Sequence, residues 1–182
     1  MDRRSALKYL GAATATALIL PSCVGDPKKV SVALNKLKIT GEEEELMGEI
    51  ADVIIPATDT PGARAVGAHH FVFVMVDDCH AEDEREKFLK GMRAFPDAVK
   101  AVADKKFSRS TPEERLEILN ALSKGGEKFP DEVRYFFDLS KNYIIQGYVT
   151  SQHFLTEVKQ YQLVPGPNFK GCIPLTEKKT IS

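Results

Sequence analysis

The chain's four histidines and three cysteines are the side chains best suited to bind a metal or to act as nucleophiles. His69 and His70 are adjacent, and Cys79 is followed directly by His80. Neighbouring residues on a helix point about 100° apart, so the two adjacent histidines are not expected to face one ion. The aspartates that follow them match no known ligand spacing. The sequence therefore predicts one buried, hydrogen-bonded histidine, one exposed histidine and no metal site.

Three aspartates, Asp59, Asp77 and Asp78, carry carboxylates that a general acid or base would need. Adjacent carboxylates do not share a helix face, and no nucleophile or set of oxyanion donors lies nearby in the sequence. Solvated or helix-capping roles are therefore predicted for them. The chain has no Rossmann glycine fingerprint, P-loop, nucleophile-elbow, zincin, haem-attachment or iron–sulfur motif. These observations predict no catalytic residue and no cofactor in this chain.

The first residues resemble an export signal. Arg3 and Arg4 form a twin-arginine pair, and a mildly apolar stretch over residues 11–20 follows. Residues 19–23, Ile-Leu-Pro-Ser-Cys, resemble a lipobox, which predicts cleavage before Cys23 and a lipid on its thiol. An ordinary secretory signal or a short membrane helix is the alternative, but the apolar run falls short of the roughly 20 residues that span a bilayer.

Export by the twin-arginine route carries proteins that have already folded. The signal therefore predicts an extracytoplasmic protein that either holds a cofactor or travels with a partner that does. Residues 1–22 would be removed, and residues 23–39, which show no clear period, would form a lipidated tether. Residues 40–182 would then form a single domain with a C-terminal tail from about residue 162.

The composition is that of a globular domain. Hydrophobic residues make up 43% of the chain and charged residues 28%. Removal of residues 1–22 leaves 160 residues with a net charge of −3, so nucleic acid is not an expected partner. Cys79 and Cys172 then remain, 93 positions apart, and in an oxidising compartment a disulfide between them is the simplest prediction. It would pin the tail to the domain and stabilise it by about 4–5 kcal/mol in the chain-entropy model. Free thiols or a bond to a partner are the alternatives.

Apolar periodicity and capping signals predict an all-α domain, an irregular bundle of five or six helices with an extended tail. Thr40 and Thr111 each begin a capping box, and Pro56 is expected to end the first helix. The run over residues 71–76 has β-propensity but no strand to pair with, which favours a helix. Pro96 is expected to kink or break the chain. The predicted helices cover residues 40–55, 65–79, 82–95 with a continuation over 98–105, 111–124, 131–147 and 150–161.

Several pieces of the sequence together are similar to one known family. The most specific are Ile-Pro-Ala-Thr-Asp-Thr-Pro-Gly-Ala at residues 55–63 and Gly-Cys-Ile-Pro at residues 171–174. Asp78-Cys79, Phe136-Phe137, Gly-Tyr-Val-Thr-Ser at residues 147–151, Tyr161 and Pro165-Gly166 complete the pattern. Over about residues 40–175 the chain resembles the gluconate 2-dehydrogenase subunit 3 family.

The resemblance implies a small, non-catalytic subunit of an extracytoplasmic dehydrogenase. In this family the small subunit accompanies a large FAD-dependent flavoprotein of the glucose–methanol–choline type, which oxidises sugars, sugar acids or other alcohols. A cytochrome c subunit often takes the electrons. The small subunit carries the export signal, and the flavoprotein crosses with it as a folded passenger. The lipobox departs from the family pattern and implies that lipid holds this complex at a membrane.

The resemblance also implies where a partner would bind. The Pro- and Gly-rich loop 56–63 and the tail 164–174 suit contact with a partner surface, although both could instead brace the chain itself. The interface candidates are Pro56, Thr58, Asp59, Thr60, Pro61, Gly62, Gly147, Tyr148, Ser151, Tyr161, Pro165 and Gly166. The alternative function is an independent lipid-anchored binding or scaffold protein. An enzyme in its own right ranks third, because no catalytic set is visible.

Overall fold

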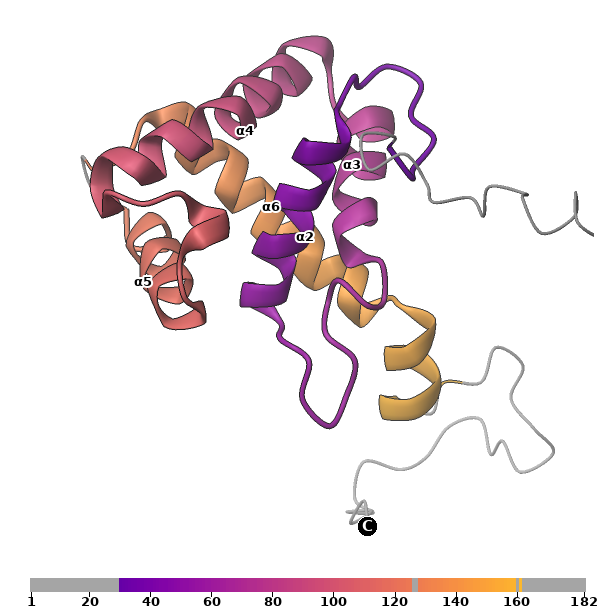
Figure 1. The fold of residues 1–182 in the computed structure, drawn as a ribbon. Helices are drawn as coiled ribbons and strands as arrows, with labels where there is room; N and C mark the ends of the chain where they lie inside the picture. The colour runs from indigo at the N-terminus through magenta and orange to yellow at the C-terminus, as the bar shows by residue number, and fades with distance from the viewer. Residues whose placement is uncertain (1–29, 126–127, 160, 162–182) are drawn as a thin grey trace, which may run out of the picture.

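The computed structural model describes residues 30–125, 128–159 and 161, and this part of the chain is all-helical, as predicted (Figure 1). It contains five α-helices, one 3₁₀ helix, one π-helical turn and no strand. In chain order these are α2 (Gly41–Ile54), α3 (Ala68–Cys79), α4 (Glu82–Ala103), η1 (Phe107–Arg109), α5 (Pro112–Ser123), α6 (Asp131–Val149) and η2 (Phe154–Val158).

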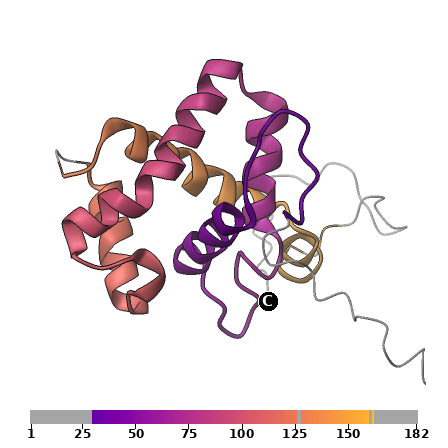
Figure 2. The ribbon, with the colours of Figure 1, turned by 45° about the horizontal axis from the view of Figure 1, so that its top comes forward.

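Helix α6 is the centre of the bundle. It packs most extensively against α4 and α3 and also touches α2 and α5 (Figures 1 and 2). Buried aromatic rings fill the α4–α6 interface: the ring centroid of Phe136 lies 5.2 Å from that of Phe88 and 5.8 Å from that of Phe95. The helices approach closely because Gly91 has no side chain; a Cβ there would lie 2.0 Å from the carbonyl oxygen of Glu132.

Both predicted capping boxes are confirmed. The Thr40 hydroxyl accepts a hydrogen bond from the Glu43 N–H (3.2 Å), and the Thr40 N–H donates to the Glu43 carboxylate (2.7 Å). Thr111 and Glu114 make the same reciprocal pair at 3.3 and 2.9 Å. Each box satisfies amide groups that the first turn of a helix leaves without partners, so these starts are fixed locally.

Of the two alternatives predicted at Pro96, a kink or a break, the break is excluded, because α4 continues through Pro96 to Ala103, as the predicted continuation over residues 98–105 requires. Proline removes one backbone donor, but Phe95 and Val99 on either side of it are fully buried against the core. Burial of this apolar face outweighs the lost hydrogen bond. The choice of helix over strand for residues 71–76 is confirmed, since they lie within α3.

The last predicted helix is shorter than expected. Helix is predicted over residues 150–161 and observed over residues 152–158, within which Phe154–Val158 form a π-helical turn. Its hydrogen bonds span five and six residues, from the Lys159 N–H to the Phe154 carbonyl (2.9 Å) and from the Tyr161 N–H to the Leu155 carbonyl (2.8 Å). Such wide turns are uncommon and are found disproportionately at functional sites.

Segment 30–39 has no helix or strand, in keeping with its lack of period, yet it is bound to the domain. The Asp77 carboxylate on α3 accepts hydrogen bonds from the N–H groups of Asn35 (2.8 Å), Lys36 (2.7 Å) and Leu37. Asp77 is 2% exposed and Leu37 4% exposed. The prediction of a solvated or helix-capping Asp77 is therefore wrong, because its partners lie about 40 residues away and leave no local signal.

The Asp77 carboxylate is held in its ionised form. Burial by itself raises its pKa, but the three N–H donors of Asn35, Leu37 and Lys36 together lower the pKa below the ordinary value. Asp78 is exposed, as is Asp59, in agreement with their predicted solvation. A buried aspartate and an exposed one thus stand side by side on α3.

Several predicted features lie outside the described residues: the arginine pair, Cys23, residues 23–29 of the tether, Pro165, Gly166, Cys172 and most of the tail. Cys79 ends α3, is exposed, and has no disulfide partner among the described residues. Its pairing with Cys172 stays a prediction. In the part of the chain that the structure describes, no helix has both the length and the apolar character needed to cross a membrane.

Candidate partner-binding surface

The loop between α2 and α3, residues 56–63, is a tight, self-braced structure. The Ala63 N–H donates to the Ile55 carbonyl (2.9 Å), and the Thr58 N–H donates to the Thr60 carbonyl (3.0 Å). Gly62 is required where the loop closes, because a Cβ there would lie 2.7 Å from the Ala57 nitrogen. These contacts leave the tip of the loop exposed, at Pro56, Ala57, Thr58, Asp59 and Thr60.

The end of α6 holds this loop. The Tyr148 hydroxyl donates to the Pro61 carbonyl (3.2 Å), which joins positions 87 residues apart. The Tyr148 ring also packs edge-on against Phe154 of η2, with centroids 5.8 Å apart. Gly147 lets α6 approach α3, since a Cβ there would lie 3.0 Å from the Phe71 side chain. The structure thus brings together two stretches that the sequence analysis had grouped only by resemblance.

The turn after α6 completes this end of the molecule. Ser151 Oγ accepts a hydrogen bond from the Phe154 N–H (3.3 Å), which fixes the start of η2. Tyr161 follows η2 and is 56% exposed. Of the interface candidates, those of loop 56–63, the end of α6, Ser151 and Tyr161 lie on connected elements at one end of the bundle (Figure 1).

Exposed apolar side chains lie on the same two elements, α6 and η2. Ile145 is 43% exposed and Val149 is 38% exposed, and their spacing of four residues places them on the same face of α6. Val158 on η2 is 52% exposed. The sequence analysis missed all three. Ile145 and Val149 could have been found from the sequence, because they form an apolar pair four residues apart that is offset from the core residue Ile144. We call Ile145, Val149, Val158, Tyr161 and the loop 56–63 the α6-end surface.

Comparison with known proteins decides the family. A family model described as gluconate 2-dehydrogenase subunit 3 matches residues 41–166, which is more than half of the chain. The chain belongs to the gluconate 2-dehydrogenase subunit 3 family. Among curated proteins and among solved structures, no significant match is found.

The family match includes every described element of this subunit 3 protein and the whole α6-end surface. It begins at Gly41, so segment 30–39, which Asp77 binds, precedes it. The all-helical fold therefore lies within the matched region, as does loop 56–63, which the Tyr148 hydroxyl and the close approach at Gly62 hold closed. The description names a subunit of a dehydrogenase, which implies an assembly of several chains.

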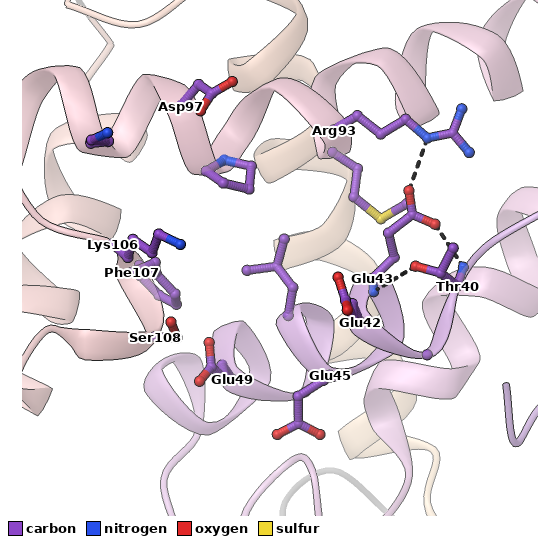
Figure 3. Close-up of a pocket in the computed structure, with 15 residues that line it drawn as sticks. Thr40, Glu42, Glu43, Glu45, Glu49, Arg93, Asp97, Lys106, Phe107 and Ser108 are labelled. Atoms are coloured by element: carbon purple, nitrogen blue, oxygen red, sulfur yellow. Dashed lines mark hydrogen bonds and ion pairs between the residues drawn. The ribbon is translucent and has the colours of Figure 1, made fainter. Parts of the chain in front are cut away.

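A cleft lies between the start of α2, the end of α4 and η1, with a volume of about 940 Å³ (Figure 3). Its walls carry charges of both signs, and several are already paired. Arg93 Nε contacts the Glu43 carboxylate at 2.8 Å, and Glu49 is bound by Arg115 at 3.2 Å. Figure 3 shows Glu42, Glu43, Glu45 and Glu49 along one wall of this cleft. This acidic wall disfavours an anionic ligand.

The two adjacent histidines do not diverge as predicted. The ring centroids of His69 and His70, both in the first turn of α3, are only 3.9 Å apart. The hydrogen bonding is also the reverse of the prediction. His69 is 8% exposed, and its Nδ1 is buried with no hydrogen-bond partner among the described residues. The less buried His70 instead bonds, through Nε2, to Glu44 (3.2 Å) and to Ser31 Oγ (3.0 Å).

The electrostatics of this cluster follow from burial. Burial, then the charges of His70 and Arg64, lowers the pKa of His69 to about 4, so the imidazole is neutral at pH 7. Burial raises the pKa of Glu44, but hydrogen bonds from Ser31 and His70 lower it below its ordinary value. The cluster therefore offers a carboxylate and a neutral imidazole side by side. His80, the other predicted histidine of interest, hydrogen-bonds Tyr143 (2.7 Å) and Glu84 (3.0 Å).

Proposed function

We propose that this chain is a non-catalytic accessory subunit of an extracytoplasmic FAD-dependent dehydrogenase that oxidises a sugar, a sugar acid or another alcohol. The FAD and the substrate site would lie on a large flavoprotein of the glucose–methanol–choline type, and a cytochrome c subunit would complete the electron path. Membership of the gluconate 2-dehydrogenase subunit 3 family supports this proposal.

The observation that carries the proposal is the α6-end surface within the matched region. Its loop is rigid before any partner binds, since Gly62 and the bond from Tyr148 to Pro61 fix it. A preformed surface loses little conformational entropy on association. Exposed Ile145, Val149 and Val158 supply apolar area, and the exposed polar residues at the tip of loop 56–63, Thr58, Asp59 and Thr60, supply polar contacts.

Export and anchoring are the proposed roles of the first residues. Arg3 and Arg4 would direct the chain and its folded flavoprotein partner through the twin-arginine route, and Cys23 would carry the lipid. The subunit would then support folding of the flavoprotein, its export and its attachment to a membrane.

The test is capture of the full chain from its native membrane fraction, with the eluate measured for flavin absorbance and its proteins identified by mass. A flavin-bearing partner of oxidoreductase size would support the accessory role. A colourless chain of normal stability without that partner would instead favour an independent lipid-anchored binding or scaffold protein.

Matched charge substitutions locate the surface. Ile145→Glu and Val149→Glu place a carboxylate on the proposed interface, and each should reduce the captured flavoprotein at least tenfold. The control is Leu116→Glu on α5, which is 50% exposed and lies on the far side of the bundle from η2 (Figure 1). Equal capture by all three variants would place the interface elsewhere, and equal loss in all three would show a non-specific effect of the added charge.

A further inference from the structure

Three side chains from two helices converge at the Glu44–His69–His70 cluster. One ring nitrogen from each of His69 and His70 and one carboxylate oxygen of Glu44 all lie within 4.8 Å of one another. Glu44 comes from the first turns of α2, and the histidines from the first turn of α3. The proposed accessory role uses none of these groups.

The unpartnered Nδ1 of His69 is the independent observation that points to a ligand. More than nine-tenths of this residue is buried, and leaving a buried nitrogen without a partner is unfavourable because its lost hydration is not replaced. A buried polar atom in a native structure calls for a partner, which a bound ion or a water can supply. The neighbours are a second imidazole and a carboxylate, which are metal ligands rather than donors suited to an organic anion.

We infer that Glu44, His69 and His70 form a binding site for one divalent transition-metal ion of the zinc class. Two imidazoles, one carboxylate and one water are a common ligand set for such an ion. The ion would sit between His70 Nε2 and Glu44 Oε1, whose separation of 3.2 Å is close to the roughly 3.3 Å between ligands of a tetrahedral zinc site. His69 would complete the set by moving its ring by up to about 1.5 Å.

The surroundings favour a cation. The Glu44 carboxylate is held ionised by the Ser31 N–H (2.8 Å), a contact of the kind that orients a metal-binding carboxylate. Arg64 is the nearby opposing charge, but it is paired with Glu45 (2.6 Å) and faces Asp52 (3.7 Å). The negative charge of Glu44 is therefore left available for a cation.

A metal here would fasten three parts of the chain together. Glu44 belongs to α2, the histidines belong to α3, and Ser31 belongs to the segment before α2. Binding to the folded state alone raises its stability in proportion to the logarithm of the metal concentration. The ion would thus stabilise the fold in a role separate from partner binding.

The test is titration of the full, tag-free chain with Zn²⁺, followed by calorimetry and by the thermal unfolding midpoint. We expect one ion per chain with a dissociation constant in the micromolar range or below, and a midpoint that rises with zinc concentration. His69→Gln and Glu44→Gln should each weaken binding at least tenfold and abolish the thermal shift. The matched control replaces the two remaining histidines, as His80→Gln with His153→Gln, and should bind zinc as the wild type does.

Each outcome decides the matter. No uptake of zinc by the wild-type chain at 100-fold molar excess would overturn the inference, as would binding that survives both ligand substitutions. Loss of binding in the control would place the ion elsewhere. If His69→Gln fails to fold by circular dichroism, Glu44→Gln alone decides, because its side chain is not part of the hydrophobic core.

Discussion

Asp77 gives the most direct test of how the N-terminal segment is bound. Its carboxylate accepts three backbone N–H groups, and an asparagine could accept at most two of them with its single oxygen. In Asp77→Asn the amide nitrogen would face one N–H donor, and the two remaining bonds would lose their charge assistance. Loss of one buried partner costs about 1–3 kcal/mol and weaker bonds cost about 1 kcal/mol more, so we expect unfolding to become easier by about 3 kcal/mol.

Urea unfolding at pH 7, followed by circular dichroism, measures this cost in a chain that has no tryptophan. The control is Asp78→Asn, the exposed neighbour on the same helix, which should change the free energy of unfolding by less than about 0.5 kcal/mol. Hydrogen exchange should show lost protection at the amides of residues 35–37 in the Asp77 variant alone. Equal stability of the two variants would refute this account of Asp77.

The pH dependence has a definite sign. The folded pKa of Asp77 is lowered, so the unfolded chain, with a pKa of about 3.9, binds the proton more readily. The stabilisation is therefore fully present above that unfolded pKa and is lost as the pH falls through the lower folded value. The difference between wild type and Asp77→Asn should persist at pH 5 and shrink below about pH 4. A difference that stays constant to pH 2 would contradict the assignment.

Two further predictions concern packing and the α6-end surface. Gly91→Ala should destabilise the fold by about 3 kcal/mol in urea unfolding, because its Cβ would overlap the Glu132 backbone. In the control Gly48→Ala, the Cβ meets only a movable arginine side chain, so its free energy of unfolding should stay within about 1 kcal/mol of wild type. Similar free energies of unfolding for these two variants would show that α4 and α6 can move apart at little cost. Tyr148→Phe should lower the free energy of unfolding by about 1 kcal/mol and increase proteolysis within loop 56–63, which loses the hydrogen bond to Pro61. An unchanged cleavage rate would show that the hydroxyl does not hold the loop.

The sequence could predict what short-range physics decides. Capping boxes at Thr40 and Thr111 and the apolar periodicity of α5 and α6 depend on residues three or four positions apart, and these elements were predicted closely. Of the kink or break expected at Pro96, the break does not occur, because burial of distant partners outweighs a local rule. The partners of Asp77 and the pairing of Tyr148 with Pro61 join residues 40 or more positions apart, so no local pattern could reveal them.

The same distinction explains the histidine cluster. A helical wheel represents each side chain by its direction from the helix axis, and on that basis His69 and His70 should point away from each other. Imidazole rings extend beyond Cβ, however, and rotation about the side-chain bonds brings their centroids to 3.9 Å. Glu44 reaches them only because α2 packs on α3. Adjacent histidines near a helix start therefore cannot be dismissed as ligands until the neighbouring helix is known.

The contacts of segment 30–39 bear on how a lipid anchor would act. Seven peptide units separate Cys23 from Val30, so a lipid on Cys23 would keep the domain within about 25 Å of the membrane surface. Any pull on that anchor would reach the domain through Ser31 at the histidine cluster and through Asn35, Lys36 and Leu37 at Asp77. The Asp77 attachment leads to α3, and the Ser31 attachment leads to α3 through His70 and to α2 through Glu44. Helix α3 packs on α6, the helix that ends at the proposed partner surface. Asp77→Asn weakens the attachment of residues 35–37 and should therefore lengthen the tether without changing the α6-end surface. Ile145→Glu or Val149→Glu changes that surface instead, so the two kinds of substitution can separate anchoring from partner binding.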